Sequence, residues 1–158
     1  MGKVKDFKNY LKSIGKNPKI NSGRTFTVDG VDASKLVSSI INFMGNEGVS
    51  FEEDTLPTVT FTRKKSGSMP PFLETGNYNP TSNEITIFVS GRGLKDCLRS
   101  LAHELIHADQ KINKGWDIEK ASEGIYGKSK DVEKIEADAY RRGNLLFRKW
   151  EESIKGSF

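Results

Sequence analysis

Apolar residues recur at the three- to four-residue spacing of an amphipathic helix in four segments, which are residues 4–14, 33–44, 94–113 and 131–154. Between the second and third segments the pattern changes to alternation of apolar and polar residues, which predicts strands at 58–63, 73–78 and 84–89. A shorter strand is expected at 24–28. This order predicts an α+β fold, in which a mixed or antiparallel sheet of three to four strands packs on the last two helices.

The helix predicted at 94–113 has one continuous apolar stripe, and the only two histidines of the chain lie nearly opposite it. The stripe consists of Leu94, Cys97, Leu101, Leu105, Ala108 and Ile112. Such a helix is expected to pack its stripe on the core and to turn its histidines toward a cleft. Because Cys97 belongs to the stripe, we expect it to be a buried thiol rather than a metal ligand.

The two histidines, His103 and His107, are four residues apart, and Glu104 directly follows the first. Positions i and i+4 lie one turn apart on the same face of a helix, so both imidazoles can reach one metal ion. Glu104 lies about 100° around the helix from His103, where it can act on a water at the metal without being a ligand. Chance produces this pattern about once in a thousand such sequences. It therefore indicates the His-Glu-x-x-His site of a zinc hydrolase.

A hydrolytic zinc site needs a third protein ligand, and because no third histidine exists an acidic residue is expected. On the last predicted helix, Glu136 lies in the middle of the apolar face, Glu133 near its edge, and Asp138 points almost directly away. A carboxylate on an inward face is costly unless a cation pairs with it, so Glu136 is the predicted ligand and Glu133 the reserve. The alternative is a salt bridge from Glu136 to a lysine or arginine. The small residues Ala139 and Gly143 would let this helix approach the histidine helix closely.

Length and composition indicate a single globular domain. The chain has 158 residues, of which 35% are hydrophobic and 29% charged, so we expect one domain over 1–158 with its core at 58–154. Residues 1–57 are expected to form a helical extension or scaffold that covers the cleft or extends the sheet. The net charge of +4 leaves room for nucleic acid, but the best basic run, 63–65, is more typical of a solvated strand end.

The compartment is predicted from what the sequence lacks. A single cysteine excludes an internal disulfide and is typical of a reducing compartment. The first residues lack the apolar stretch of a signal peptide, and no segment has the length of a transmembrane helix. We therefore expect a cytoplasmic protein that does not contact a membrane.

The motif at 103–107, followed after 29 residues by Glu136, resembles the gluzincin branch of the zincin metallopeptidases. It is most similar to the compact minigluzincin and ImmA/IrrE-like proteins, over about residues 72–150, whereas residues 1–57 show no such likeness. The resemblance implies a zincin-like fold with an edge strand that pairs with substrate backbone, supplied here by 73–78 or 84–89. It also implies a residue that stabilises the tetrahedral intermediate, for which Tyr140 is the better candidate and Tyr126 the weaker.

These residues together predict a zinc metalloendopeptidase. Zinc on His103, His107 and Glu136 would activate a water, and Glu104 would act as the general base in hydrolysis of a peptide or protein substrate. The alternative function is a catalytically silent zincin-fold module that binds protein or nucleic acid. Glu104 favours the enzyme, because a purely structural site has no use for that carboxylate.

Overall fold

The computed structural model describes residues 20–22, 27–28, 31–64, 74–119 and 130–155, with only the backbone described for residues 20–32. Among these residues, the main sheet has four strands in the order β1-β4-β6-β5. Three of them, β1 (Ile20–Ser22), β4 (Thr58–Thr62) and β6 (Glu84–Phe88), run parallel, and β5 (Gly76–Asn79) is antiparallel to β6. A separate short hairpin pairs β2 (Thr27–Val28) with β3 (Val31–Asp32).

In the described part of the chain, three helices accompany the sheet, namely α2 (Ala33–Asn46), α3 (Leu94–Ile112) and α5 (Lys130–Lys155). Their bounds agree with the predicted helices to within two residues, and together with the mixed sheet they confirm the α+β class. The helix predicted at 4–14 lies outside the described residues, as does most of the strand predicted at 24–28. The strand predicted at 73–78 begins only at Gly76 and ends at Asn79.

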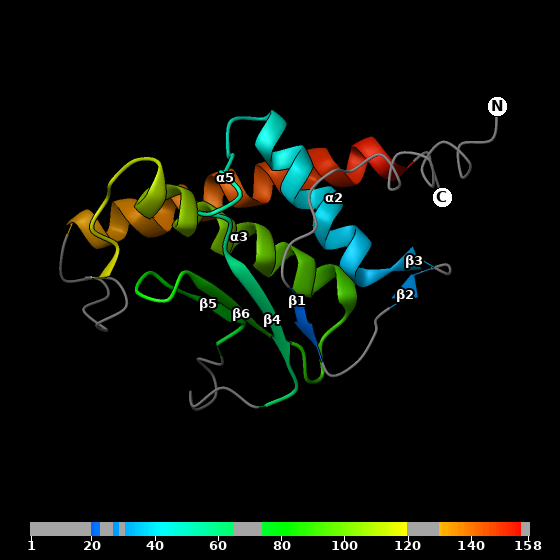
Figure 1. Cartoon of the computed structure of the whole chain (residues 1–158). Helices are drawn as coiled ribbons and strands as arrows, with labels where there is room; N and C mark the ends of the chain where they lie inside the picture. Colours follow the sequence, from blue (N-terminus) through cyan, green and yellow to red (C-terminus); the bar gives the residue numbers. More distant parts are fainter. Residues whose placement is uncertain (1–19, 23–26, 29–30, 65–73, 120–129, 156–158) are drawn as a thin grey trace.

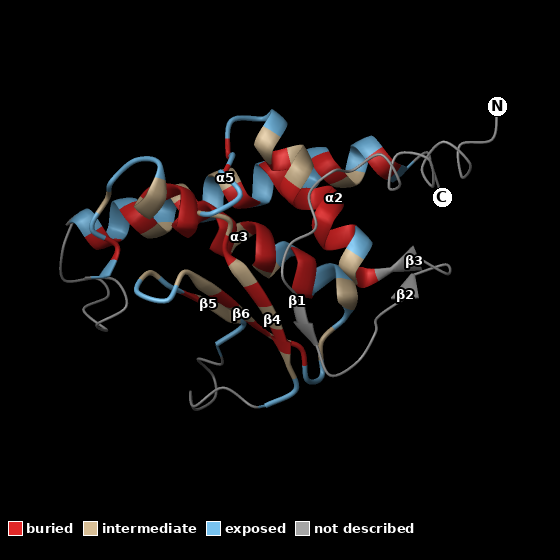
Figure 2. Ribbon diagram, viewed as in Figure 1, coloured by how far each residue is buried: buried red, intermediate tan, exposed pale blue. Residues whose placement is uncertain are grey.

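The sheet, α3 and α5 form successive layers (Figure 1). Buried and half-buried residues alternate along β4 and β6, because successive side chains of a strand point to opposite faces. The buried side chains Val59, Phe61, Ile85 and Ile87 join the apolar stripe of α3 in one core. Figure 2 shows this burial along α3, which has buried residues on both the sheet side and the α5 side.

Part of the region 1–57 is built into this architecture. The backbone of β1 pairs in parallel with β4, at the edge of the sheet opposite β5. Helix α2 packs against α5, where the Trp150 indole nitrogen donates a buried 2.9 Å hydrogen bond to Ser39 Oγ. Of the two roles expected for this region, β1 therefore fulfils the extension of the sheet.

None of the described helices combines the length and the apolar character needed to cross a lipid bilayer.

Candidate metal centre

Helices α3 and α5 approach each other closely at the first histidine. A Cβ atom added to Gly143 of α5 would lie 3.0 Å from the Cα atom and 3.3 Å from the backbone nitrogen of His103. Ala139, one turn before Gly143, is completely buried. The close approach that these two small residues predict is thus present, and it brings the polar face of α3 against α5.

The side chains of His103, His107 and Glu136 converge in this interface. His103 Nε2 lies 3.6 Å from Glu136 Oε2, and His107 Nε2 lies 3.2 Å from Glu136 Oε1. One potential ligand atom from each of the three residues lies within 4.8 Å of the others. Two ligands bound at 2.0–2.1 Å to a tetrahedral ion are about 3.3 Å apart. The two imidazoles and the carboxylate could therefore hold a metal ion with little rearrangement.

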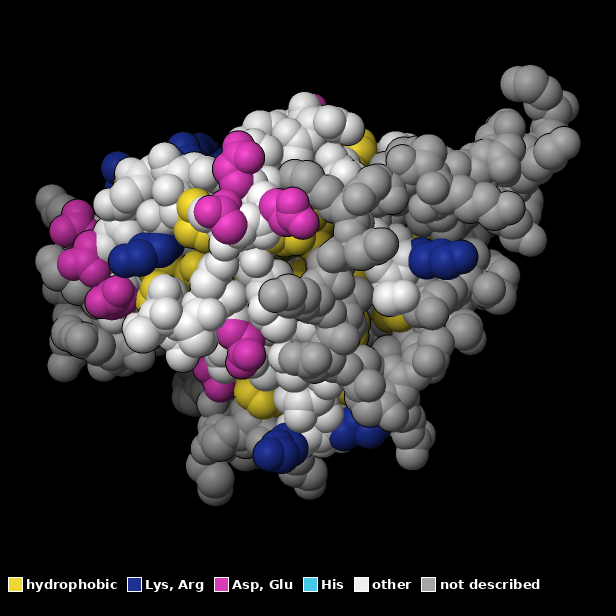
Figure 3. Space-filling view, in the orientation of Figure 1, with side chains coloured by type: hydrophobic (Ala, Val, Ile, Leu, Met, Phe, Trp, Pro, Cys, Tyr) yellow, Lys and Arg dark blue, Asp and Glu magenta, His cyan; other side chains and the backbone are white. Residues whose placement is uncertain are grey.

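The two histidines lie in the interface between α3 and α5. His107 is buried and His103 is only partly exposed, because their face of α3 is covered by α5. Neither histidine is visible on the face drawn in Figure 3, where acidic side chains form separate small groups. Cys97 is a buried free thiol, as expected from its place in the apolar stripe.

The carboxylates of α5 differ in their surroundings. Glu136 has ion pairs with the two histidines, and among the described residues none with lysine or arginine. Glu133 is exposed and takes no part in the described cluster. Asp138 is predicted to point almost directly away from the apolar face of α5, but Gln110 of α3 and Arg142 reach it and leave its side chain only 11% exposed.

Electrostatic coupling holds Glu136 ionised. Burial alone would raise the pKa of Glu136, but hydrogen bonds from His103 and His107 and the charges of these histidines lower it to about 2. Burial alone would lower the pKa of His107, but the hydrogen bond to Glu136 and the charge of Glu104 raise it. The cluster thus stabilises positive charge between the three side chains, which is the property that a cation site needs.

Glu104 is buried beside this cluster. Burial raises the pKa of its carboxyl, and the nearby charges of Glu136 and Glu74 raise it further, whereas His107 and His103 act in the opposite direction. A carboxyl in such surroundings can take up a proton more readily than one in water. Glu104 is therefore a buried carboxyl with a raised pKa, directly after the potential ligand His103 in the sequence.

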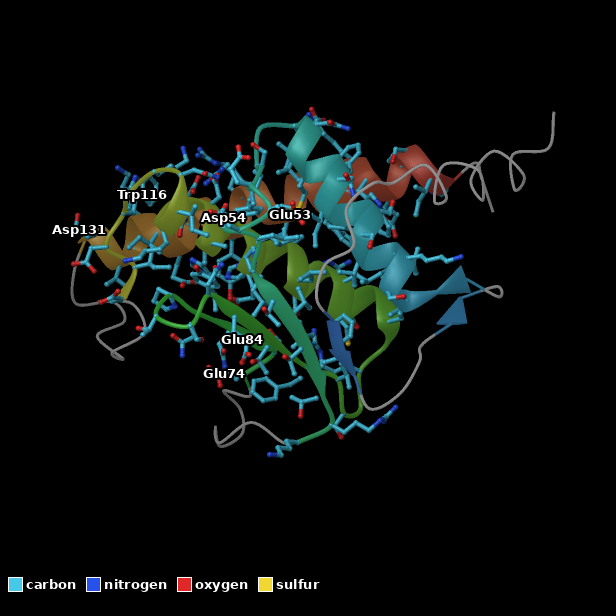
Figure 4. The ribbon with its side chains drawn as sticks, viewed as in Figure 1. Glu53, Asp54, Glu74, Glu84, Trp116 and Asp131 are labelled. Carbon is cyan, nitrogen blue, oxygen red and sulfur yellow. The ribbon has the colours of Figure 1, made fainter. Side chains whose placement is uncertain are left out.

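Strand β5 passes close to Glu104. A Cβ atom on Gly76 would lie 3.5 Å from Glu104 Cγ and 3.1 Å from the backbone oxygen of Thr86, so glycine permits this approach. Of the two candidates for an edge strand, β5 is the edge of the described sheet and β6 is internal. Figure 4 shows Glu74, which precedes β5, and Glu84, which begins β6, on the sheet side of the molecule, whereas Trp116 and Asp131 lie where α3 ends and α5 begins.

Tyr140 lies at the exposed side of the cluster. Its ring centroid is 4.6 Å from that of His103, and the residue is 60% exposed. The other candidate, Tyr126, lies outside the described residues. Tyr140 is therefore the described tyrosine whose ring contacts a potential ligand.

Sequence reasoning did not detect Gln110, which contacts His107 from the side opposite Glu136. Its position three residues after His107 places it on the same helical face, but a single glutamine between the charged residues Asp109 and Lys111 is no recognisable signal.

No protein-family profile, curated protein or solved structure matches this chain significantly, so the gluzincin-like reading depends on the motif and on the geometry of the cluster alone.

Proposed function

We propose that the protein is a zinc-dependent metallopeptidase of gluzincin type, with His103, His107 and Glu136 as ligands. The main support is the convergence of these three side chains next to a buried fourth group, Glu104, that is suited to proton transfer. Two imidazoles and one carboxylate form the ligand set of hydrolytic zinc sites that keep one position open.

When bound, zinc would lower the pKa of a water molecule and polarise the carbonyl group of the scissile bond. Glu104 accepts the proton of the attacking water and returns it to the departing amine. Tyr140, beside His103, is the candidate for a hydrogen bond to the oxyanion of the intermediate. Edge strand β5 offers backbone groups to an extended peptide, which would place that peptide next to Glu104.

Elemental analysis of zinc per chain tests the site first. We expect one zinc in the wild type, loss of zinc in Glu136→Ala, and retention in Glu133→Ala, which removes an exposed carboxylate from the same helix. Folded wild type that binds no zinc even when metal is supplied would refute the proposal. The His103–Glu136–His107 contacts would then be an ion-pair cluster, and a binding module for protein or nucleic acid would become the better hypothesis.

A further inference from the structure

Gln110 is completely buried within α3, three residues after the ligand candidate His107. A primary amide carries two N–H donors and one acceptor oxygen, and burying these groups without partners is costly. All three find partners here, and the identity of each partner settles which way the amide faces.

The amide nitrogen of Gln110 donates to the backbone oxygen of Ile135 at 3.0 Å and to Asp138 Oδ2 at 2.9 Å. A backbone oxygen and a carboxylate can only accept, so both amide hydrogens are used toward α5. The remaining group, Gln110 Oε1, lies 2.8 Å from His107 Nδ1. Because this oxygen can only accept, His107 Nδ1 must carry a hydrogen.

The hydrogen on Nδ1 also determines the state of the other nitrogen of His107, Nε2. A neutral imidazole with hydrogen on Nδ1 has a lone pair on Nε2, which is the atom that lies 3.2 Å from Glu136 Oε1. At this distance a lone pair and a carboxylate oxygen repel each other unless a cation, either a proton or a metal ion, lies between them. The hydrogen bond from His107 to Gln110 therefore presents the correct nitrogen to a metal.

The Asp138 carboxylate that accepts from the Gln110 amide is itself held by Arg142. Arg142 donates two hydrogen bonds to Asp138, with distances of 2.8 Å from Nε and 2.6 Å from Nη2. It donates a third, from Nη1, to Asp109 Oδ2 of α3 at 2.9 Å. These contacts connect α3 to α5 and keep the Asp138 carboxylate in place as an acceptor for the Gln110 amide.

We propose that Gln110 is a positioning residue for His107: it fixes the hydrogen on Nδ1 and the orientation of the ring, so that Nε2 faces the metal. This inference rests on the proposed metal site. A group that orients a ligating histidine changes metal affinity by about 10- to 100-fold when it is replaced.

The test compares Gln110→Met, which keeps the length but removes all three hydrogen bonds, with Gln110→Glu, which keeps an oxygen for His107. Zinc affinity is measured by competition with a chromophoric chelator. We expect Gln110→Met to bind zinc about 10- to 100-fold more weakly. Gln110→Glu loses the donors to Ile135 and Asp138 but keeps the oxygen for His107, so it should bind zinc more tightly than Gln110→Met. Ser39→Ala is the matched control, since it removes another completely buried hydrogen bond to α5 and should leave zinc affinity unchanged.

Nitrogen-15 NMR of the histidine side chains detects the hydrogen on His107 Nδ1 directly. This measurement separates an effect on His107 from a general loss of stability. The wild type, with or without zinc, should show a His107 Nδ1–H proton protected from solvent exchange, and Gln110→Met should lose this protection.

Absence of the proton in metal-free wild type overturns the proposal even if Gln110→Met does not fold. Wild-type zinc affinity in Gln110→Met, or equal losses in Gln110→Met and Gln110→Glu with the proton still protected, would also overturn it. If the wild type binds no zinc, the proposed function fails, and the metal-free spectrum still decides the role of Gln110.

Discussion

A Cβ atom on Gly143 would lie 3.0 Å from the Cα atom of His103, so α5 rests against the backbone of α3 at the first potential ligand. The glycine is required by this contact between helices and not by an unusual backbone angle. Because Glu136 lies two turns earlier on α5, the contact at Gly143 sets how far its carboxylate can reach toward the histidines. Helix packing and ligand geometry are therefore coupled at this point.

Gly143→Ala should weaken both packing and metal binding. The added methyl group meets backbone atoms, which cannot rotate away, so α5 must shift, at a cost of about 1–3 kcal/mol in the free energy of unfolding. The shift moves Glu136 relative to His103 and should lower zinc affinity. Chemical denaturation and chelator competition measure the two effects, with Asn144→Ala at the next, exposed position as control. Unchanged stability and zinc affinity in Gly143→Ala would show that the close contact is unnecessary.

Glu104→Gln should separate metal binding from catalysis. The amide keeps the shape of the side chain but cannot accept the proton of water, so peptide hydrolysis should fall by at least about 100-fold while zinc content stays at one per chain. Glu74→Gln is the control, because it removes an exposed carboxylate that influences Glu104 only through its charge. The assignment of Glu104 as general base would be wrong if Glu104→Gln retained turnover.

The ionisation of Tyr78 should limit stability in alkaline solution. Burial raises the pKa of Tyr78 from 10.0 to about 12, so the unfolded chain loses this proton at lower pH than the folded protein. The contribution of protonated Tyr78 to the free energy of unfolding is complete below pH 10. It is lost as the pH rises toward 12, by an amount on the order of 2 kcal/mol. Denaturation at several pH values should show this loss in the wild type.

Tyr78→Phe supplies the comparison for that measurement. It lacks the ionisable group and the 2.8 Å hydrogen bond from the tyrosine hydroxyl to Asn83 Oδ1. It should therefore be about 1 kcal/mol less stable at neutral pH and lose less stability between pH 10 and 12. Parallel pH profiles in the two proteins would contradict the assignment of the alkaline loss to Tyr78.

The helical pattern predicts most of the cluster because it depends on one helix at a time. Spacing places His103 and His107 on one face of α3, and phase separates Glu136 from Glu133 on α5, as the structure also does. Phase fails for Asp138, since the direction of a side chain on its own helix does not reveal which long polar side chains of a neighbour reach it. The sequence does not reveal Gln110 for the same reason, because its hydrogen-bond partners Ile135 and Asp138 lie on α5.

Sheet order is a further property that local patterns do not contain. Alternation predicts that β5 and β6 exist, but it cannot assign the edge, because both carry apolar residues and both flank the same turn. The order is decided by the parallel pairing of β4 with β6, which encloses β6 and leaves β5 at the edge of the described sheet. The edge strand is thus the one whose Gly76 lies close to Glu104.

Arg92 should control the position of this edge strand. Its Nη1 atom donates to the backbone oxygens of Thr75 at 2.9 Å and Phe88 at 2.7 Å. Its Nη2 atom donates to the backbone oxygen of Asp96 at 2.9 Å and to Ser100 Oγ at 2.6 Å. One guanidinium group thus connects the residue before β5, the end of β6 and the first turns of α3.

In Arg92→Lys a single ammonium group cannot serve four acceptors in this planar arrangement. We expect a loss of about 1–3 kcal/mol in the free energy of unfolding and a higher KM for a peptide substrate, because β5 is less firmly held. Zinc affinity should stay at the wild-type value, since none of these contacts involves the ligand cluster. Arg148→Lys, at an exposed position of α5, is the control and should change neither quantity measurably. If Arg92→Lys instead lost zinc with an unchanged KM, the contacts of Arg92 would be important for the arrangement of α3 and not for that of β5.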